Sequence, residues 1–353
     1  MPTESKQLRV LILRLGAMGD ILHALPAVTA LRAKHPEWFI GWAVEPQWRG
    51  LLAAEAATAR GPAMPLVDQL HVVPAKKWGR RPLSLQTIDQ IRRTRRQLRS
   101  ARYNVCIDLQ GAVRSAMLGK WAHPQRLIGE EKPREWAARY LFDEHVPTRG
   151  THVIEQAVEV ANAVAHEELP VMLPELPVSS DAERSCDAKL AAFDGRRFVL
   201  LNPGAGWGAK RWPAERYGEL ARSFAADGFG VAINSGPGEE MLAQEVNAAS
   251  GNIGVALSPT LDELIAVTRR ASLMIAGDTG PLHLASALGK PVVGIFGPTD
   301  PARNGPFGGK FRVLRHPESK RDHSRRAEPE AGLLTITPDE VLHAAMELLQ
   351  NAS

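Results

Sequence analysis

The stretch Leu8-Arg-Val-Leu-Ile-Leu-Arg-Leu-Gly-Ala-Met-Gly-Asp20 decides the fold. Its first seven residues are mostly apolar and rich in branched side chains, which predicts a short buried strand. Gly16 and Gly19 mark a turn directly after this strand, and a helical pattern begins near Asp20. A strand, a glycine turn and a helix in this order are typical of a doubly wound parallel sheet.

The alternation of strands and helices continues through both halves of the chain. Further strands are expected in the first half at 38–44, 69–73, 104–109 and 126–128. In the second half we expect strands at 198–202, 229–234, 272–276 and 292–296, and helices at 213–226, 239–249, 261–270 and 281–288. Because strands separated by helices form parallel sheets, the pattern predicts an α/β protein with two Rossmann-like, doubly wound domains.

A proline-containing stretch with few periodic positions, 167–181, is the expected linker between the halves. We predict a first domain over 1–170, a second over 171–337, and a closing helix over 338–353 that packs on either domain. Ligands of open α/β sheets bind beyond the carboxyl ends of the strands. The two domains are therefore expected to face each other across a cleft lined by the loops that follow strands.

The composition is that of a globular protein, with 44% apolar and 23% charged residues in a chain of 353. The apolar runs are too short to cross a bilayer, and the polar start of the chain lacks the apolar segment of a signal peptide. Cys106 and Cys186 match no metal-binding spacing and fit a reducing compartment. These features predict a cytoplasmic protein.

Positive charge is unevenly distributed, although the net charge is only +4. Eight arginines lie between Arg80 and Arg102 against one acid, Asp89, and a second basic stretch covers 312–326. The apolar residues of the first region share one helical face in the sequence pattern, with the arginines opposite: Leu85, Ile88, Ile91 and Leu98. Such clusters either form a solvated helix face or attract nucleic acid, anionic lipid or a phosphorylated substrate.

The loop after the first strand contains the carboxylate of Asp20. Its Gly16 and Gly19 allow close approach of a ligand, but the G-x-G-x-x-G fingerprint of dinucleotide-binding proteins is absent. Asp20 is either the N-cap of the following helix or a catalytic carboxylate. Pro26 implies that this helix is kinked or that its regular part starts near Leu25.

Two loops of the second half have the composition of anion-binding sites. In Asn202-Pro-Gly-Ala-Gly-Trp-Gly-Ala-Lys-Arg-Trp-Pro213, backbone N–H groups at Gly204 and Gly206 and the amine of Lys210 suit phosphate; the alternative is a flexible surface loop. In Ala276-Gly-Asp-Thr-Gly-Pro-Leu-His283, Asp278 or Thr279 is expected to cap a helix whose N-terminus favours a diphosphate.

His283 lies about one turn into that helix and either donates to the same anion or is buried and satisfied by the backbone. The loop 297–301 follows the next strand and is expected to line the same cleft.

These segments resemble the ADP-heptose:lipopolysaccharide heptosyltransferase family, which has the GT-B fold. The opening Val10-Leu-Ile-Leu-Arg-Leu-Gly-Ala-Met-Gly-Asp-Ile-Leu-His-Ala-Leu-Pro26 is similar to the N-terminal signature of the heptosyltransferase I type. Further segments match in order and spacing, up to about Gly305: Ile107-Asp-Leu-Gln-Gly111, Lys210-Arg-Trp-Pro213, Gly277-Asp-Thr-Gly-Pro-Leu-His283 and Phe296-Gly-Pro-Thr-Asp-Pro301.

The resemblance implies an inverting transferase that moves heptose from ADP-heptose to the Kdo-bearing inner core of lipopolysaccharide. Asp20 would be the general base and Lys210 would hold the departing diphosphate. The other residues implied on the donor side are Gly204, Gly206, Glu239 at the ribose, Thr260 at adenine, Asp278, Thr279, Gly280 and His283. Those implied on the acceptor side are Gly16, Met18, Gly19, His23, Lys76, Lys77, Arg80, Arg81, Gln110 and Arg114.

A lipid-linked acceptor further implies peripheral binding to the anionic inner leaflet. We expect no nucleic-acid partner, no cofactor and no metal, since no D-x-D-like pair stands where it would hold a metal under a diphosphate. Two other functions fit the architecture: a sugar-nucleotide epimerase, and a non-catalytic nucleotide-binding protein. A nicotinamide dehydrogenase is disfavoured by the missing fingerprint.

Overall fold

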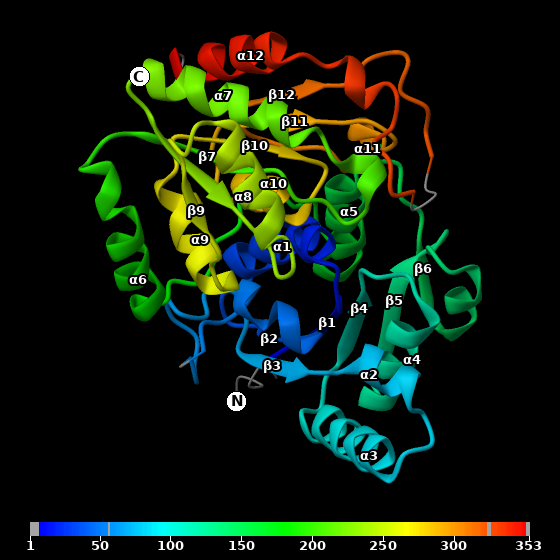
Figure 1. Cartoon of the computed structure of the whole chain (residues 1–353). Helices are drawn as coiled ribbons and strands as arrows, with labels where there is room; N and C mark the ends of the chain where they lie inside the picture. The colour runs from blue at the N-terminus through cyan, green and yellow to red at the C-terminus, as the bar shows by residue number, and fades with distance from the viewer. Residues whose placement is uncertain (1–6, 56, 323–325, 351–353) are drawn as a thin grey trace. The chain divides into compact units, whose positions relative to one another are not determined.

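The opening strand, β1 (Arg9–Leu13), lies in a six-stranded parallel sheet with the order β3-β2-β1-β4-β5-β6. Val10, Leu11, Ile12 and Leu13 are completely buried, because helices cover both faces of such a sheet. The computed structural model describes residues 7–55, 57–322 and 326–350 (Figure 1). The chain forms two units, Met1–Pro177 and Val178–Ser353, and the division falls inside the stretch 167–181.

The first unit has the strand order of a Rossmann domain. Its strands are β1, β2 (Phe39–Val44), β3 (Gln69–Val72), β4 (Val105–Asp108), β5 (Arg126–Glu130) and β6 (Glu144–Val146). Its α-helices are α1 (Met18–Lys34), α2 (Ala75–Arg80), α3 (Leu85–Ser100), α4 (Val113–Ala122) and α5 (Val153–Ala165). Two short 3₁₀ helices, η1 (Pro46–Leu51) and η2 (Trp136–Leu141), complete it.

The second unit repeats this order in a second parallel sheet, β12-β11-β10-β7-β8-β9. Its strands are β7 (Phe198–Asn202), β8 (Gly230–Asn234), β9 (Val255–Leu257), β10 (Leu273–Gly277), β11 (Val292–Ile295) and β12 (Phe311–Leu314). Its α-helices are α6 (Ser180–Leu190), α7 (Ala214–Ala226), α8 (Glu240–Ala249), α9 (Leu261–Arg270), α10 (Gly280–Ala287), α11 (Pro301–Asn304) and α12 (Pro338–Gln350). Its 3₁₀ helices are η3 (Ala191–Phe193), η4 (Gly208–Lys210) and η5 (Leu333–Thr335).

Alternate residues of each central strand face different helices. In β7, Leu201 belongs to the core beneath α7 and α12, whereas Leu200 belongs to the core beneath α6, α9 and α10. Figure 1 shows α7 and α12 side by side over the second sheet. The closing helix therefore packs on the second unit through Val341 and Leu348.

Each sheet has one topological switch point, where consecutive crossovers leave in opposite directions. It lies between β1 and β4 in the first unit and between β7 and β10 in the second. Ligands of doubly wound sheets bind at the carboxyl ends of the strands at this point. The three loops singled out in the sequence follow β1, β7 and β10, so they lie at these two positions.

Several local expectations were wrong. Helix α1 runs without interruption from Met18 through the buried Pro26, so it does not start near Leu25, and its N-cap is Ala17 rather than Asp20. Leu85 is 86% exposed and does not share the buried face of α3. The strand patterns did not predict β6, β9 and β12, because these short edge strands include exposed or half-buried positions.

Among the residues that the structure describes, no helix has both the length and the apolar character needed to span a bilayer. The polar start of the chain, residues 1–6, lies outside the described residues.

Candidate functional sites

At the switch point of the first unit, the carboxylate of Asp20 is held from two sides. Its Oδ2 accepts a hydrogen bond from Ala17 N–H at 3.0 Å, and its Oδ1 lies 3.1 Å from Nη2 of Arg14. Asp20 therefore caps α1 from the third helical position, reaching back to the N-cap backbone. Its side chain remains 38% exposed, so one carboxylate is both fixed in orientation and accessible.

Arg14 connects the loop after β1 to the loop after β4. Its Nε donates to the carbonyl of Asp20 at 3.1 Å, and its Nη1 donates to the carbonyl of Leu109. In return, the side-chain oxygen of Gln110 accepts the N–H of Leu15 at 2.7 Å. The two loops are thus tied together by side-chain-to-backbone bonds at the end of the sheet where ligands are expected.

Asp108, at the end of β4, fixes the second of these loops. It is 1% exposed, and its carboxylate accepts the N–H groups of Gln110 and Gly111 and the hydroxyl of Ser115. Burial raises the pKa of Asp108 to about 6, against the lowering effect of these hydrogen bonds.

Gly16 is required where it stands because a Cβ atom there would lie 2.7 Å from Nε1 of Trp48. The amide of Gln47, oriented to accept both donors, bonds Trp48 Nε1 at 3.1 Å and Nζ of Lys76 at 3.3 Å. The backbone N–H of Lys76 also donates to the buried Glu45 at 2.8 Å. These contacts anchor the start of the basic helix α2 beside the loop that carries Asp20.

The other residues expected on the acceptor side differ in accessibility. Lys76, Lys77 and Arg80 are exposed on α2, and Arg81 is its exposed C-cap. Gly19 is half-buried in the first turn of α1, and Arg114 is exposed on α4. Met18 and His23 are each only 7% exposed, and the His23 ring lies edge-on to His152 at 5.5 Å. His23 is therefore a packed side chain with little surface open to an acceptor.

At the switch point of the second unit, Lys210, Asp278 and His283 form one buried cluster. The amine of Lys210 is paired with the carboxylate of Asp278, and each side chain is 10% exposed. Nε2 of His283 lies 3.2 Å from the other carboxylate oxygen. Although burial alone would raise the pKa of Asp278, the hydrogen bond from His283 and the charge of Lys210 together lower it.

The ring of Trp207 completes the surroundings of Lys210, with Nζ 4.3 Å from the ring centroid. A carboxylate only accepts hydrogen bonds, so Asp278 cannot donate to a phosphate. Its geometry instead positions two donors, the Lys210 amine and the His283 imidazole.

The N-terminus of α10 leaves backbone donors for a ligand. Thr279 is the N-cap, but its side chain makes no capping hydrogen bond; the hydroxyl donates to the carbonyl of Gly277 at 3.2 Å. Asp278 does not cap either, because its carboxylate faces Lys210 and His283. The first-turn N–H groups of a helix lack partners within it and, with the helix dipole, favour an anion.

Asn202 links this helix start to the glycine loop. Its Nδ2 lies 3.2 Å from the carbonyl of Gly204 and 3.4 Å from the hydroxyl of Thr279, and its Oδ1 accepts from Asn234 at 2.6 Å. Gly204 in turn lies against Glu239, since a Cβ atom there would come 1.9 Å from the carboxylate. The structure thus brings Gly204, Glu239, Thr279 and the Lys210 cluster to one end of one sheet.

Thr260 is already engaged in capping α9. Its hydroxyl accepts the N–H of Glu263 at 3.3 Å, and its own N–H donates to the Glu263 carboxylate at 2.8 Å. The backbone N–H of Thr260 and one lone pair of its hydroxyl are therefore used by the cap. Gly206, by contrast, has open space on its Cβ side.

The basic segment 312–326 contributes to the same end of the second sheet. After β12, Arg315 donates to the carbonyl of Gly297, and Arg321 pairs with Asp300. The carbonyl of Arg326 accepts Ala209 N–H at 3.1 Å, and Glu330 N–H donates back to the Ala209 carbonyl at 3.1 Å. We call residues 315–322 and 326–330 the strap; residues 323–325 lie outside the described residues.

Among the described residues, no group of three or more His, Cys, Asp or Glu side chains is arranged to hold a metal ion.

The family model of glycosyltransferase family 9 (heptosyltransferase) matches residues 91–333, more than half of the chain. The chain belongs to this family. It is therefore a glycosyltransferase, and the epimerase, dehydrogenase and non-catalytic alternatives are set aside.

Relatives of both heptosyltransferase types align with this family 9 chain. Lipopolysaccharide heptosyltransferase 1 of Escherichia coli K12 is 28% identical over 88% of this chain and 94% of its own length. Lipooligosaccharide heptosyltransferase 2 of Haemophilus influenzae is 23% identical over 97% of this chain and 99% of its own length.

Solved structures share the GT-B fold along nearly the whole chain. A family 9 glycosyltransferase from Veillonella parvula has a TM-score of 0.82 at 20% identity and covers 98% of both chains. An E. coli heptosyltransferase with ADP-2-deoxy-2-fluoro heptose has a TM-score of 0.75 at 23% identity, covering 98% of this chain and all of the other. The expected two-domain α/β architecture is confirmed at the level of the fold.

Sequence reasoning overlooked several side chains that organise these sites in the family 9 enzyme. Arg14, Asp108, Asn202 and Asn234 were assigned no role, yet each makes the contacts described above. A signal was present, because Asp108, Asn202 and Asn234 are the last residues of buried strands in a parallel sheet. A buried polar side chain at a carboxyl strand end holds the following loop rather than the core.

Proposed function

We propose that this glycosyltransferase is of the heptosyltransferase 1 type and transfers heptose from ADP-heptose to a Kdo residue of the lipopolysaccharide inner core. Two similarities support the proposal. The relative from E. coli K12 is named a lipopolysaccharide heptosyltransferase 1, and a solved E. coli heptosyltransferase is described with an ADP-heptose analogue. The opening motif that ends in Met18-Gly-Asp-Ile-Leu-His23 resembles the same type.

In this proposal the second unit holds the donor. Lys210, His283 and the first-turn N–H groups of α10 donate hydrogen bonds to the diphosphate, with Gly204, Gly206, Thr279 and Gly280 allowing its close approach. Asp278 keeps Lys210 and His283 oriented, and Glu239 accepts from the ribose hydroxyls. Thr260 borders adenine through its carbonyl. Negative charge grows on the diphosphate as the sugar leaves, so fixed donors stabilise the transition state more than the bound donor.

The first unit supplies the base and the acceptor contacts. Asp20 removes the proton of the acceptor hydroxyl, whose oxygen bonds to the anomeric carbon on the face opposite the diphosphate. The bond from that carbon to the diphosphate breaks and ADP leaves with both electrons, inverting the anomeric centre. Lys76, Lys77, Arg80, Arg81, Gln110 and Arg114 bind the carboxylate and phosphate groups of the acceptor, while Gly16, Met18, Gly19 and His23 shape the loop around Asp20.

The observation that carries this proposal is that the Asp20 carboxylate is both held in one orientation and accessible. A general base must be oriented and must also reach the substrate, and Asp20 is held by Ala17 N–H and Arg14 while 38% of its side chain remains exposed.

The test is incubation of the purified protein with ADP-heptose and a Kdo-bearing lipid A acceptor, followed by mass spectrometry. The expected product is heavier by one heptose residue, with release of ADP. A donor-only reaction controls for hydrolysis and isomerisation. Transfer to an acceptor that already bears heptose, with none to Kdo, would instead indicate the heptosyltransferase 2 type.

A further inference from the structure

All three nitrogen atoms of the Arg14 guanidinium have partners inside the first unit. Nη2 lies 3.1 Å from Oδ1 of Asp20, Nε donates to the Asp20 carbonyl at 3.1 Å, and Nη1 donates to the carbonyl of Leu109. Only 15% of the Arg14 side chain is exposed. Because a guanidinium is planar, these three contacts fix its plane and leave little of it to meet a substrate.

The carboxylate of Asp20 needs two contacts to keep one orientation. The terminal torsion of an aspartate side chain is broad and roughly two-fold, so a single hydrogen bond leaves the carboxylate plane free to turn. Ala17 N–H bonds Oδ2 at 3.0 Å and Arg14 bonds Oδ1, so each oxygen is held separately. A carboxylate has about four acceptor positions, and these two contacts leave others for a substrate hydroxyl.

The loop after β4, which receives Nη1 of Arg14 at Leu109, is itself held in place. The buried carboxylate of Asp108 accepts the N–H of Gln110 at 2.8 Å. The side-chain oxygen of Gln110 accepts an N–H from the loop after β1 at 2.7 Å. Through Arg14, the loop that carries Gln110 is therefore connected to the carboxylate of Asp20.

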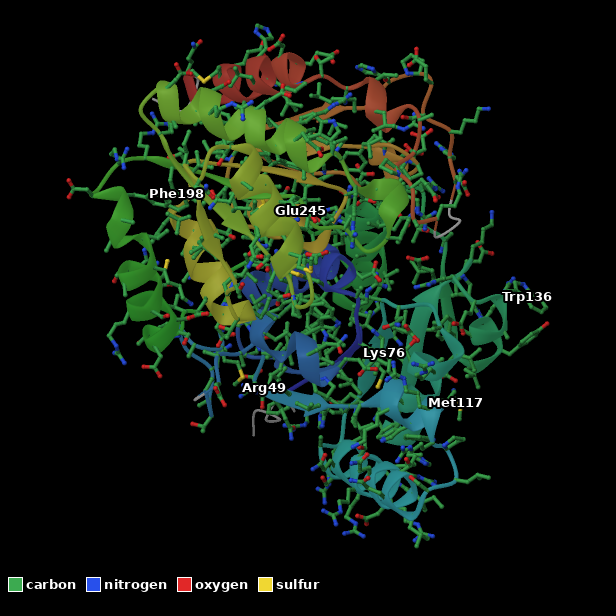
Figure 2. All side chains as sticks on the ribbon, viewed as in Figure 1. Arg49, Lys76, Met117, Trp136, Phe198 and Glu245 are labelled. Carbon is green, nitrogen blue, oxygen red and sulfur yellow. The ribbon has the colours of Figure 1, made fainter. Side chains whose placement is uncertain are left out.

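Within the described part of the chain, Arg14 is the one residue that forms an ion pair with Asp20. Lys76, labelled in Figure 2, has its Nζ 3.3 Å from the amide oxygen of Gln47 and holds the start of α2 instead. The charge of Arg14 also favours ionisation of Asp108, whose pKa burial raises to about 6, but that carboxylate is 1% exposed and cannot reach a substrate. Asp20 is therefore the accessible one of two carboxylates that Arg14 stabilises.

We propose that Arg14 is the positioning residue of the base: it fixes the plane of the Asp20 carboxylate and ties it to the loop that carries Gln110. This role rests on the proposed function of Asp20 as the base of the transfer. Arg14 then acts on the rate of proton removal and not on the binding of either substrate. The effect is large enough to measure, since misplacing a reacting group by about 1 Å can lower a rate about 10²-fold.

The first measurement is the steady-state kinetics of Arg14→Met, which removes the guanidinium and keeps an apolar stem. We expect kcat to fall about 10²-fold, with little change in KM for ADP-heptose or for the Kdo-bearing acceptor. Arg14→Lys keeps the charge but not the planar fork, so it should lose less than Arg14→Met.

The matched control is Arg9→Met, which should have normal kinetic constants. Arg9 is a half-buried arginine at the other end of β1, and its Nε donates to the carbonyl of Ala101 at 2.7 Å. Unfolding curves and calorimetry with ADP show which variants are folded. Should Arg14→Met be unfolded, Arg14→Lys serves for the same comparisons.

The decisive measurement is kcat of the double variant Arg14→Met with Asp20→Asn. If Arg14 acts through the base, its removal has no further effect once the base is gone, so the double variant should be as slow as Asp20→Asn alone. Two losses that multiply would overturn the proposal. So would a raised acceptor KM with unchanged kcat in Arg14→Met, which would place Arg14 in direct contact with the acceptor.

Two kinds of failure are distinguishable in this set of variants. A near-normal kcat in Asp20→Asn contradicts the assignment of the base itself. A slow Asp20→Asn beside a normal Arg14→Met contradicts only the role of Arg14.

Discussion

The amine of Lys210 is paired with the carboxylate of Asp278, and only 10% of either side chain is exposed. His283 bonds the second oxygen of the same carboxylate. A buried charge pair is costly to form and is seldom retained for stability alone. In the proposed reaction the leaving group is a diphosphate, and we propose that the pair keeps a positive amine in place before the donor arrives.

We predict that Lys210→Ala weakens binding of ADP and ADP-heptose and lowers turnover. Loss of one fixed donor to a developing anion costs about 3–4 kcal/mol in the transition state. Calorimetry with ADP measures the binding component, and steady-state kinetics measures the rest. The matched control is Lys290→Ala, since Lys290 is also a half-buried lysine of the second unit. It lies just before β11, at the amino end of the strand, whereas the switch-point loops follow the carboxyl ends.

An unchanged dissociation constant for ADP in Lys210→Ala would remove Lys210 from the donor site. Lys210→Ala also removes the positive partner of the Asp278 carboxylate. The free energy of unfolding of Lys210→Ala and of Lys290→Ala must therefore be measured alongside.

We predict that Asp20→Asn folds and binds ADP normally but loses about 10²- to 10⁴-fold in kcat. The asparagine oxygen still accepts Ala17 N–H, so the cap of α1 is retained while the base is lost. Asp143→Asn is the control, because Asp143 also pairs with a basic residue, accepts a backbone N–H and is 43% exposed. Near-normal kcat in Asp20→Asn would exclude Asp20 as the base.

The fold and the position of the sites follow from local patterns in this chain. Buried parallel strands are nearly continuous apolar runs, and glycine turns after them mark where the chain leaves the sheet. This is why β1, β7, β10 and β11 were expected almost at their observed bounds. The switch points then follow from the doubly wound order, and with them the loops after β1, β7 and β10.

Contacts between distant segments did not follow from the sequence. Nothing local indicates that Asp278 holds Lys210, 68 residues away, or that Arg14 bonds the carbonyl of Leu109, 95 residues away. Pro26 does not mark the start of the regular helix near Leu25, one of its two expected effects, because tertiary packing buries the residue and the helix continues through it.

We predict that Asp108 makes stability fall as the pH rises from about 4 to about 6. Its pKa is raised to about 6 in the folded chain, so the folded state binds more protons than the unfolded state in this window. The loss is about 3 kcal/mol by linkage. Urea unfolding of the unchanged protein and of Asp108→Asn across this window isolates the effect, because the other titrating groups are common to both. Parallel pH profiles would contradict the raised pKa.

We predict that a substitution against the strap weakens ADP binding, although the substituted residue lies outside the proposed donor contacts. A Cβ atom at Gly208 would lie 1.6 Å from the carbonyl oxygen of Ala327, so Gly208→Ala must displace backbone in the strap or in the loop that carries Lys210. We expect a weaker affinity for ADP, by about tenfold for each 1.4 kcal/mol lost, with little change in acceptor affinity. Gly309→Ala is the control, since Gly309 has open space on its Cβ side in the same unit. If Gly208→Ala bound ADP as tightly as Gly309→Ala, the strap would have no part in holding Lys210, and the contacts at Ala209 would serve stability alone.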